Sequence, residues 1–524
     1  MSTAAATTRR ARLLRAELLR SHRTFTWGSL AVSLAMAVYC LVLAQAARLN
    51  GLYDDGGQWD GNILAWLSFY PAAVALPIGA LTGAMAEWRE QRWRYGGTAW
   101  RPVPAARSTL ARAAVLVLAA LAAQVVLLLP VVAHGLLLGQ GLGPAGRYLP
   151  FGLLMWVGTG GAALLGALAC RLLGGVGVGL APAVAFVCCV AGAVGAESAG
   201  WQLRPWTWLM RGSLPLLGVH GNSVPLEPGS PVWHWPWWPS AVLLTGLFAA
   251  ALALLVAVPE RSLGGRGRIR RLAKAGQIQP RRQGHGVSTS RPVFAALPAS
   301  PRLSGRRRPL RALLLVLPWG VWSLLAVLMV AFISLVNALY GSGTALSVLG
   351  LVCLPVSATV AGMTAWSAQS GARRGLLLRE RVGVLDAVTL GLTTVFLSAV
   401  ATVSWVAAGG SAAAVSGLAP AHMLLVAPWV LLMSTAAAYA VNQLAGLATS
   451  VAVAVFGLLT SLVIAGTEVL SEALWPAAPW GWGQVVSTAP GRWVLVTGLS
   501  ALLAAAGLGA CVLGGRSAAL RAGT

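Results

Sequence analysis

The feature that most constrains this chain is a series of long apolar runs that recurs from one end to the other. Twelve runs reach about twenty residues, the length an α-helix needs to cross the hydrocarbon core of a bilayer. Inside a bilayer every backbone polar group must be bonded within the protein, and a helix achieves this within one segment. We therefore predict an all-α polytopic membrane protein of about 12 transmembrane helices.

The runs fall into two sets of six, which predicts two parallel six-helix repeats. The first set is 25–47, 62–86, 110–138, 149–170, 175–197 and 239–258. The second set is 311–338, 344–366, 384–408, 420–441, 443–467 and 492–514. The predicted domains are a cytoplasmic interfacial helix (1–24), a first six-helix half (25–258), a basic flexible linker (259–310) and a second six-helix half (311–524).

Composition agrees with a bilayer as the solvent. Only 10% of the 524 residues are charged, whereas soluble domains carry about 25%. The first apolar run follows a basic stretch without a small-residue cleavage site, which indicates an uncleaved helix. The net charge of +25 would suggest nucleic acid in a soluble protein. Here the cations lie between apolar runs, so we expect no nucleic acid partner.

The arrangement of cations predicts the orientation. With the N-terminus placed in the cytoplasm, the Lys and Arg residues fall on the inner side, as the positive-inside rule requires. The exceptions among the 38 are Arg48, Arg147, Arg204, Arg211 and Arg492. Both termini are therefore predicted to be cytoplasmic. Lys274 is the sole lysine, an arginine bias typical of GC-rich bacteria, and we expect a bacterial plasma membrane.

The two halves share an order of features. The steps Trp27-Gly28 and Trp319-Gly320 stand near the first span of each half. After the fifth span, an acid is followed by Pro-Trp-x-Trp, at 205–208 in the first half and 479–482 in the second. The acids are Glu197 and Glu468. These coincidences favour duplication over chance.

Two cytoplasmic segments could touch a partner or the membrane. Residues 9–23 combine leucines at helical spacing with a cationic face, which predicts an interfacial amphipathic helix or, equally, a simple positive-inside anchor. The segment after the second span carries Glu87, Arg89, Glu90 and Arg92. It predicts a short amphipathic cytoplasmic helix on which a partner could push; the alternative is a membrane-surface loop.

This arrangement resembles the permeases of the ABC-2 type exporter family. An acid-containing coupling helix after the second span precedes a segment like x-P-V-x-R in that family, and Arg101-Pro102-Val103-Pro104-Ala105-Ala106-Arg107 stands in that place. The outer segment 198–238 matches the family's re-entrant element. Within the family, the permeases of lantibiotic and peptide immunity exporters are the most similar. The resemblance implies coupling of Glu87, Arg89, Glu90 and Arg92 to a separate ABC ATPase, in two copies.

The second half departs from this pattern, because its loop at 369–374 lacks the glutamates. The chain also lacks an ATPase motif of its own. A phosphate-binding loop needs Lys followed by Ser or Thr, and Lys274 is followed by Ala275. We thus expect no enzyme and no cofactor in this chain, with ATP and Mg²⁺ bound by the partner ATPase.

Other sites are sparse, with no catalytic or metal motif. The six cysteines lie in apolar runs and are predicted to be buried hydrophobes. The candidate outer gate or cap comprises Glu197, Trp206, Trp208, Glu468, Trp480 and Trp482. For Glu197 and Glu468 a hydrated cap is favoured over substrate contact, and Trp233–Trp238 are predicted to form an aromatic belt. Asp386 and Glu380 are expected to pair with nearby arginines.

Two functions fit these observations. The first is a fused ABC-2 type permease that exports a hydrophobic or amphipathic molecule, whether drug, peptide or lipid. The alternative is a proton-coupled secondary transporter of the major facilitator type, which also has twelve spans and a central linker. The loop of about twenty residues after the second span and the shortage of buried charges favour the first.

Overall fold

The computed structural model describes residues 3–22, 24–49, 59, 63–93, 103–139, 141–258, 313–370, 382–411, 419–466, 471–472 and 474–522. In these ranges 12 helices are long and apolar enough to cross a membrane, which confirms the predicted all-α polytopic class. The chain divides into two compact units. The first unit comprises Met1–Glu260 together with Pro318–Thr524, and the second unit is Arg261–Leu317. Every element below belongs to the first unit; the predicted linker at 259–310 lies outside the described residues.

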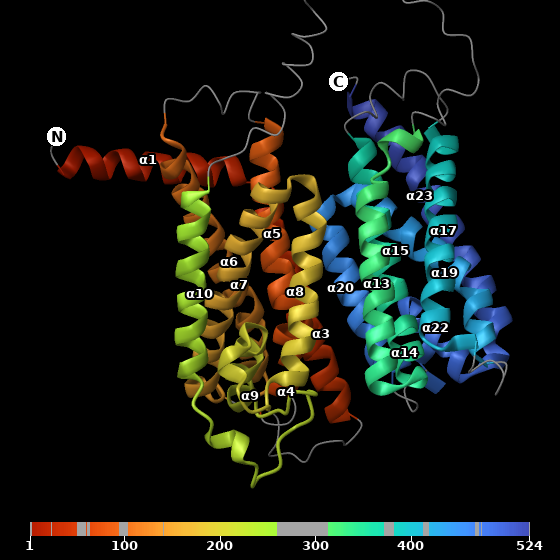
Figure 1. Cartoon of the computed structure of the whole chain (residues 1–524), viewed down its shortest axis with the longest axis horizontal. Helices are drawn as coiled ribbons and strands as arrows, with labels where there is room; N and C mark the ends of the chain where they lie inside the picture. Colours follow the sequence, from red (N-terminus) through yellow and green to blue (C-terminus); the bar gives the residue numbers. More distant parts are fainter. Residues whose placement is uncertain are drawn as a thin grey trace, which may run out of the picture. The chain divides into compact units, whose positions relative to one another are not determined.

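The N-terminal helix α1 (Thr3–Ser21) runs across the direction of the spans rather than along it (Figure 1). Arg12 and Arg15 are exposed, as are the apolar side chains of Leu14 and Leu19. A helix that exposes both cations and leucines has the character of an interfacial helix. It packs against α6 (Ala105–Leu137).

The first half is built around α7 (Ala145–Leu173), which packs against most other helices of that half. The other elements are α2 (Phe25–Gly28) with α3 (Leu30–Leu49), α4 (Leu64–Leu67), η2 (Tyr70–Val74) with α5 (Ala75–Trp93), α6, α8 (Gly175–Gly195), α9 (Trp208–Leu217) and α10 (Trp238–Ala257).

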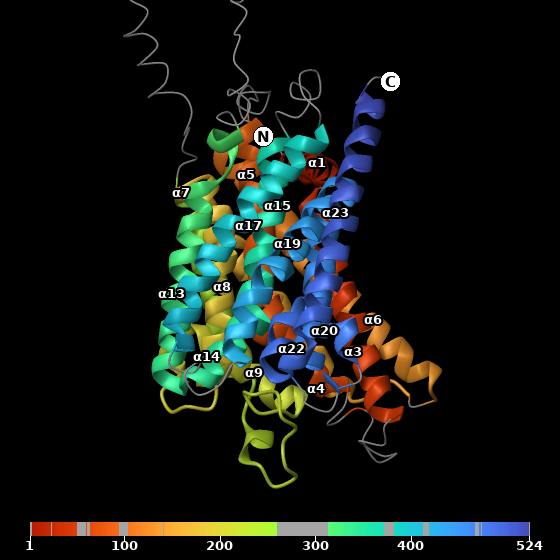
Figure 2. The ribbon, with the colours of Figure 1, turned by 90° about the vertical axis from the view of Figure 1, so that its right-hand side faces the viewer.

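The second half has the same plan around α19 (Ala419–Ala445). Its elements are α13 (Trp319–Tyr340), α14 (Ser342–Val348), η7 (Leu349–Cys353) with α15 (Leu354–Ser370), α17 (Val382–Ala407), α20 (Leu447–Ala465), α22 (Trp482–Thr488) and α23 (Trp493–Ala522). Figure 2 faces this half. The seventh span begins at Trp319 rather than near 311, because Pro318 caps the helix.

Two local details repeat between the halves. The second span of each half contains a π-helical turn, η2 in one and η7 in the other. Each Pro-Trp-x-Trp motif forms a 3₁₀ turn that begins at its proline, η5 (Pro205–Thr207) or η9 (Pro479–Gly481), and its second tryptophan then starts α9 or α22. Such irregular features at matching places support duplication more strongly than helix number does.

Close helix crossings hold each half together. A Cβ on Gly83 of α5 would collide with the backbone carbonyl of Ala163 in α7, and a Cβ on Gly362 of α15 would collide with that of Thr435 in α19. Small residues let two helix backbones approach, which strengthens dispersion contacts inside a membrane. The second and fourth spans of each half are therefore joined backbone to backbone.

The halves contact each other crosswise. In each half, the first span packs on the fifth span of the other: α3 lies on α20, and α13 touches α8. The Tyr39 hydroxyl donates to the Leu459 carbonyl at 2.8 Å, and its ring meets Phe456 edge-on. This reciprocal pattern is what two parallel repeats related by an axis along the membrane normal would produce.

One predicted element is wrong in its boundaries. Residues 86–93 are not a separate short helix after the second span; they are the last two turns of α5. The helix continues because no Gly or Pro interrupts it there and because other helices neutralise its charges. A hydropathy window ends the span too early when the charged residues are paired inside the protein.

Candidate functional site

Seven charged residues form a network at the α1 end of the bundle, referred to below as the α1–α5 charge network. They are Glu17, Arg20, Glu87, Arg89, Glu90, Arg112 and Arg171. Glu87 is only 2% exposed and Glu90 8%. Ionised groups are rarely buried unless they are paired, so the geometry of these pairs decides what the network does.

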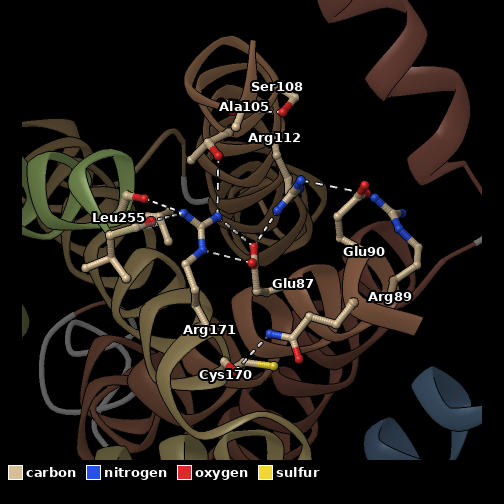
Figure 3. A network of polar contacts seen from close by, with 12 residues as sticks. Glu87, Arg89, Glu90, Ala105, Ser108, Arg112, Cys170, Arg171 and Leu255 are labelled. Atoms are coloured by element: carbon tan, nitrogen blue, oxygen red, sulfur yellow. Dashed lines mark hydrogen bonds and ion pairs between the residues drawn. The ribbon is translucent and has the colours of Figure 1, made fainter. Parts of the chain in front are cut away.

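Glu87 lies at the centre of the network, held by two arginines. Arg171 of α7 approaches with two nitrogens, Nε at 2.9 Å from Oε1 and Nη2 at 3.0 Å from Oε2 (Figure 3). Arg112 of α6 donates from Nη1 to the same Oε2. The bidentate geometry fixes both side chains, since the planar guanidinium matches a carboxylate edge to edge.

Arg171 extends the network to two further elements. Its Nη1 donates to the carbonyls of Leu255 and, at 3.1 Å, of Val258, at the end of α10. Its Nη2 also reaches the Thr109 hydroxyl of α6 at 3.4 Å. One buried guanidinium thus joins four helices of the first half (Figure 3).

The remaining pairs tie α1 to the end of α5. Arg89 donates to Glu17 at 2.7 Å, and Arg20 donates to Glu90 at 2.6 Å. Arg20 also pairs with Glu17 within α1, and Arg112 lies 3.7 Å from Glu90. Glu90 therefore touches cations from two different helices, so a movement of α1 cannot leave α5 unaffected.

The sequence predicted part of this site. Glu87, Arg89 and Glu90 are brought together, while the side chain of Arg92 lies outside the described part of the chain. We predicted that these residues contact a partner protein. In the structure the carboxylates of Glu87 and Glu90 are buried inside the protein. Sequence reasoning missed Glu17, Arg20, Arg112 and Arg171 as members. A usable signal was present, because Arg112 and Arg171 adjoin apolar runs in a chain with only 13 acids.

At the matching place in the second half, the described residues form hydrogen bonds between side chains of three spans. Gln369 of α15 donates to Thr389 at 2.8 Å, and Tyr439 of α19 donates to Asp386 of α17 at 2.6 Å. The spans involved are again the second, third and fourth of the half. Asp386 is fully buried and accepts from Tyr439. The arginines near it in the sequence lie outside the described residues, so its pairing with an arginine stays a prediction. Glu380 lies outside the described residues.

The opposite end of the molecule carries the predicted cap. Figures 1 and 2 both place the segment between α8 and α10 at the end away from α1. There Glu197 lies 3.1 Å from Nδ1 of His220, and Glu227 lies 3.1 Å from its Nε2. Glu197 also accepts from the Gly221 amide at 2.7 Å. The hydrogen bonds that His220 donates to these two carboxylates raise its pKa, and the bond to Glu227 has the largest effect.

The candidate gate tryptophans mainly have structural contacts. Trp482 is 2% exposed and donates to the Trp475 carbonyl, while Trp480 packs over Gly457. Trp208 donates to the Gln202 carbonyl at 3.0 Å, and Trp206 is 42% exposed. Glu197 bonds to His220 rather than to any of these rings. Glu468 lies outside the described residues, so its place in a gate stays a prediction.

Arginines stack on tryptophans of the predicted aromatic belt at the same end. The Arg211 guanidinium lies 3.1 Å above the Trp235 ring and 5.3 Å from Trp201, and Arg147 stacks 5.0 Å from Trp233. Cation–π contacts of this kind strengthen when they are shielded from water. Across the described ranges no group of three His, Cys, Asp or Glu side chains is placed to hold a metal ion.

Comparison with known proteins yields no match: no family model, no curated protein and no solved structure is similar to this chain.

Proposed function

We propose that this multi-pass membrane protein is the permease subunit of an ATP-binding-cassette exporter. It would move a hydrophobic or amphipathic substrate out of a bacterial cell, powered by a separate ATPase that docks at the cytoplasmic face. In this proposal the α1 end is cytoplasmic. The observation that carries it is the α1–α5 charge network, which links an interfacial helix to four spans of one half.

Two features support a mechanical role for this network. Arg20 and Arg89 connect α1 to α5 through short ion pairs, and Arg171 connects α5 to α6, α7 and α10. A buried pair breaks at high cost, about 3–5 kcal/mol when one partner is removed. Helices joined in this way move together, as transmission of a force from a docked partner requires. Because Glu87 and Glu90 are buried, we propose that α1 receives the partner's movement and that these acids pass it on.

The crosswise contacts between the halves support a shared pathway. Movement of α5 would shift the first half against α20 and α13 of the second, and rigid-body rotation of packed units is a common way to change access. The second half has Gln369, Asp386 and Tyr439 where the first half has its network, so we propose that the two halves couple to the ATPase unequally.

The first experiment asks what powers transport. The full chain is purified in mild detergent, any co-purifying ATPase is identified by mass spectrometry, and the complex is reconstituted into liposomes. We expect efflux of a hydrophobic dye to require ATP and to continue when a protonophore removes the proton gradient. Efflux that needs only the proton gradient would overturn the proposal.

The second experiment tests the α1 link with charge reversal. Glu17→Arg and Arg89→Glu each remove the α1–α5 pair and place like charges together, so each variant should lose most ATP-driven transport. The double variant Glu17→Arg with Arg89→Glu restores opposite charges and should recover much of it. Suppose instead that the double variant loses as much ATP-driven transport as each single variant while all three elute normally in size-exclusion chromatography. That result would show that the Glu17–Arg89 pair does not transmit movement from α1 to α5.

The alternative is a proton-coupled secondary transporter, and one observation favours it. Asp386 is a fully buried carboxyl inside a predicted span, bonded to Tyr439, and membrane acids often mark proton pathways. On this reading Asp386→Asn abolishes proton-driven efflux. On the leading reading, the same variant retains ATP-driven efflux. The liposome assay therefore separates the two functions.

A further inference from the structure

An apolar groove of about 430 Å³ runs along the outer side of the first half. Its walls are α6, which contributes Leu110, Ala114 and Leu121 among others, and α10, which contributes Leu252. Every lining residue is apolar. Leu110 is 47% exposed and Leu121 39%, so the groove is open sideways rather than enclosed. Its volume falls within the range of small-molecule sites, about 300–1,000 Å³.

The groove has a fixed aromatic wall. Trp156 of α7 lines it, and the indole N–H of Trp156 donates to the Val117 carbonyl of α6 at 3.0 Å. This bond satisfies the polar atom of the ring and holds the ring between α6 and α7. The groove is therefore a preformed apolar surface, suited to a flexible hydrocarbon chain rather than to a polar ligand.

An exposed cation, Arg107, lies one turn before the groove on α6. Arg107 lies in the first turn of α6, three residues before Leu110 and seven before Ala114, on the same face of the helix. Its side chain is exposed, and it forms no ion pair within the described ranges. The apolar wall and the exposed guanidinium thus follow one another along one helix face.

Helix α1 shows where the membrane surface lies. It crosses the spans with Arg12 and Arg15 exposed beside exposed Leu14 and Leu19, as an interfacial helix does (Figure 1). Since α1 packs on α6 at the end where α6 begins, Arg107 lies near the level of lipid headgroups. The groove starts one turn deeper, at the level of acyl chains.

We infer that this groove is a binding site for an anionic phospholipid, with an acyl chain against Trp156 and the phosphate at Arg107. We expect an anionic headgroup because the guanidinium of Arg107 has no ion-pair partner among the described residues. We expect a hydrocarbon chain because every lining residue of the groove is apolar. The assignment of the lipid to the cytoplasmic leaflet rests on the proposed function and its orientation. The proposal that the groove binds an anionic phospholipid does not depend on that orientation.

Quenching of Trp156 fluorescence by brominated lipid tests this directly. The full chain is placed in nanodiscs with a small fraction of phosphatidylglycerol or phosphatidylcholine, each brominated on the acyl chain. The difference between the native chain and Trp156→Phe isolates the signal of Trp156. One basic residue near a membrane surface contributes about 1 kcal/mol, so we expect half-maximal quenching at about fivefold less phosphatidylglycerol than phosphatidylcholine.

Variants separate the two parts of the site. Arg107→Ala should remove the preference for phosphatidylglycerol, and Arg107→Lys should keep it. Ala114→Phe fills the groove and should weaken quenching by both lipids, whereas Val125→Phe, on an exposed part of the same helix, should not. Equal quenching by both lipids in the native chain, or no effect of Arg107→Ala or Ala114→Phe, would overturn the inference. The assay uses neither ATPase nor transport, so its failure is distinct from failure of the proposed function.

Discussion

At the scale of single residues, Glu87 carries the largest consequences. Its carboxylate balances two buried arginines, Arg112 and Arg171. Replacement by Gln keeps the size and removes the charge, which leaves two guanidinium groups inside a low-dielectric region. We expect Glu87→Gln to destabilise the protein by about 3–5 kcal/mol, measured by denaturant unfolding in detergent.

A matched control is available at the other end of the molecule. Glu472 is exposed, and surface changes of this kind usually stay within about 0.5 kcal/mol. Glu472→Gln should therefore unfold at the denaturant concentration of the native chain. If Glu87→Gln behaves like this control, the acid is not the centre of the network.

His220 is expected to make the segment between α8 and α10 depend on pH. Both of its ring nitrogens face carboxylates, so the charged imidazolium is the form that can donate to both. Its pKa is raised above the ordinary 6.5, chiefly by Glu227. The link is therefore complete below about pH 6.5 and is lost as the pH rises through the raised pKa. The pKa of Glu227 is lowered from 4.5 by the same bond, so its part is lost only under more acidic conditions.

Hydrogen exchange of residues 218–227 measures this effect. We expect protection near pH 6 and, after correction for the intrinsic pH dependence of exchange, reduced protection near pH 9. Arg211 lies close enough to Glu197 to act on it electrostatically, but it stays charged throughout this range. His220→Gln should remove the pH dependence while the cation–π contacts of Arg211 stay in place. A native-like pH profile in that variant would exclude the histidine as its source.

At the scale of elements, the second and fourth spans depend on glycines at their crossings. Any side chain on Gly83 or Gly362 meets a backbone carbonyl of the facing helix, which cannot move aside alone. Overpacking costs roughly 1–3 kcal/mol, so Gly83→Ala and Gly362→Ala should both lower the thermal midpoint. Gly391→Ala is the control, because a Cβ there meets open space and Ala favours a helix. If Gly83→Ala has the same thermal midpoint as the Gly391→Ala control, α5 and α7 do not cross as closely as the structure shows.

The elements also show what the sequence could predict. All twelve spans were identified, because an apolar run of about twenty residues has few alternatives in a bilayer. The end of the second span was misjudged, since hydropathy counts Glu87 and Glu90 as water-exposed although arginines from other helices neutralise them. Arg171 lies between two apolar runs, and hydropathy likewise places it in a loop. Pairing between distant segments is a property of the tertiary structure, and an arginine beside an apolar run is its only local trace in this site.

At the scale of the whole molecule, the repeated halves account for the crosswise interface. Duplication of a six-helix unit keeps the orientation of every span, so a contact between a first and a fifth span is expected twice. It occurs at α3 with α20 and at α13 with α8. The halves nevertheless differ in sequence at this place, since Gln369, Asp386 and Tyr439 join the second, third and fourth spans of the second half where the first half has Glu87, Arg112 and Arg171.

The interface predicts a specific crosslink between the halves. A Cβ on Gly28 would lie 2.5 Å from the Cβ of Ala448, and a disulfide needs about 3.5–4.5 Å between these atoms, so a small shift of α2 suffices. A protease site in the linker region makes the link visible. After cleavage at this site, the oxidised double variant Gly28→Cys, Ala448→Cys should run as one band on a denaturing gel, because the disulfide joins the two halves. After reduction it should run as two bands. Gly320→Cys with Ala448→Cys should always give two, because a Cβ on Gly320 has no neighbour in the described structure.

The same crosslink bears on mechanism. If transport requires the first half to move against the second, then the oxidised Gly28→Cys, Ala448→Cys protein should lose most efflux and regain it when the disulfide is reduced. Each single variant controls for the substitutions themselves. Full efflux in the oxidised double variant would show that α2 and α20 stay together through the cycle. The moving boundary would then have to lie elsewhere, for example where α8 meets α13.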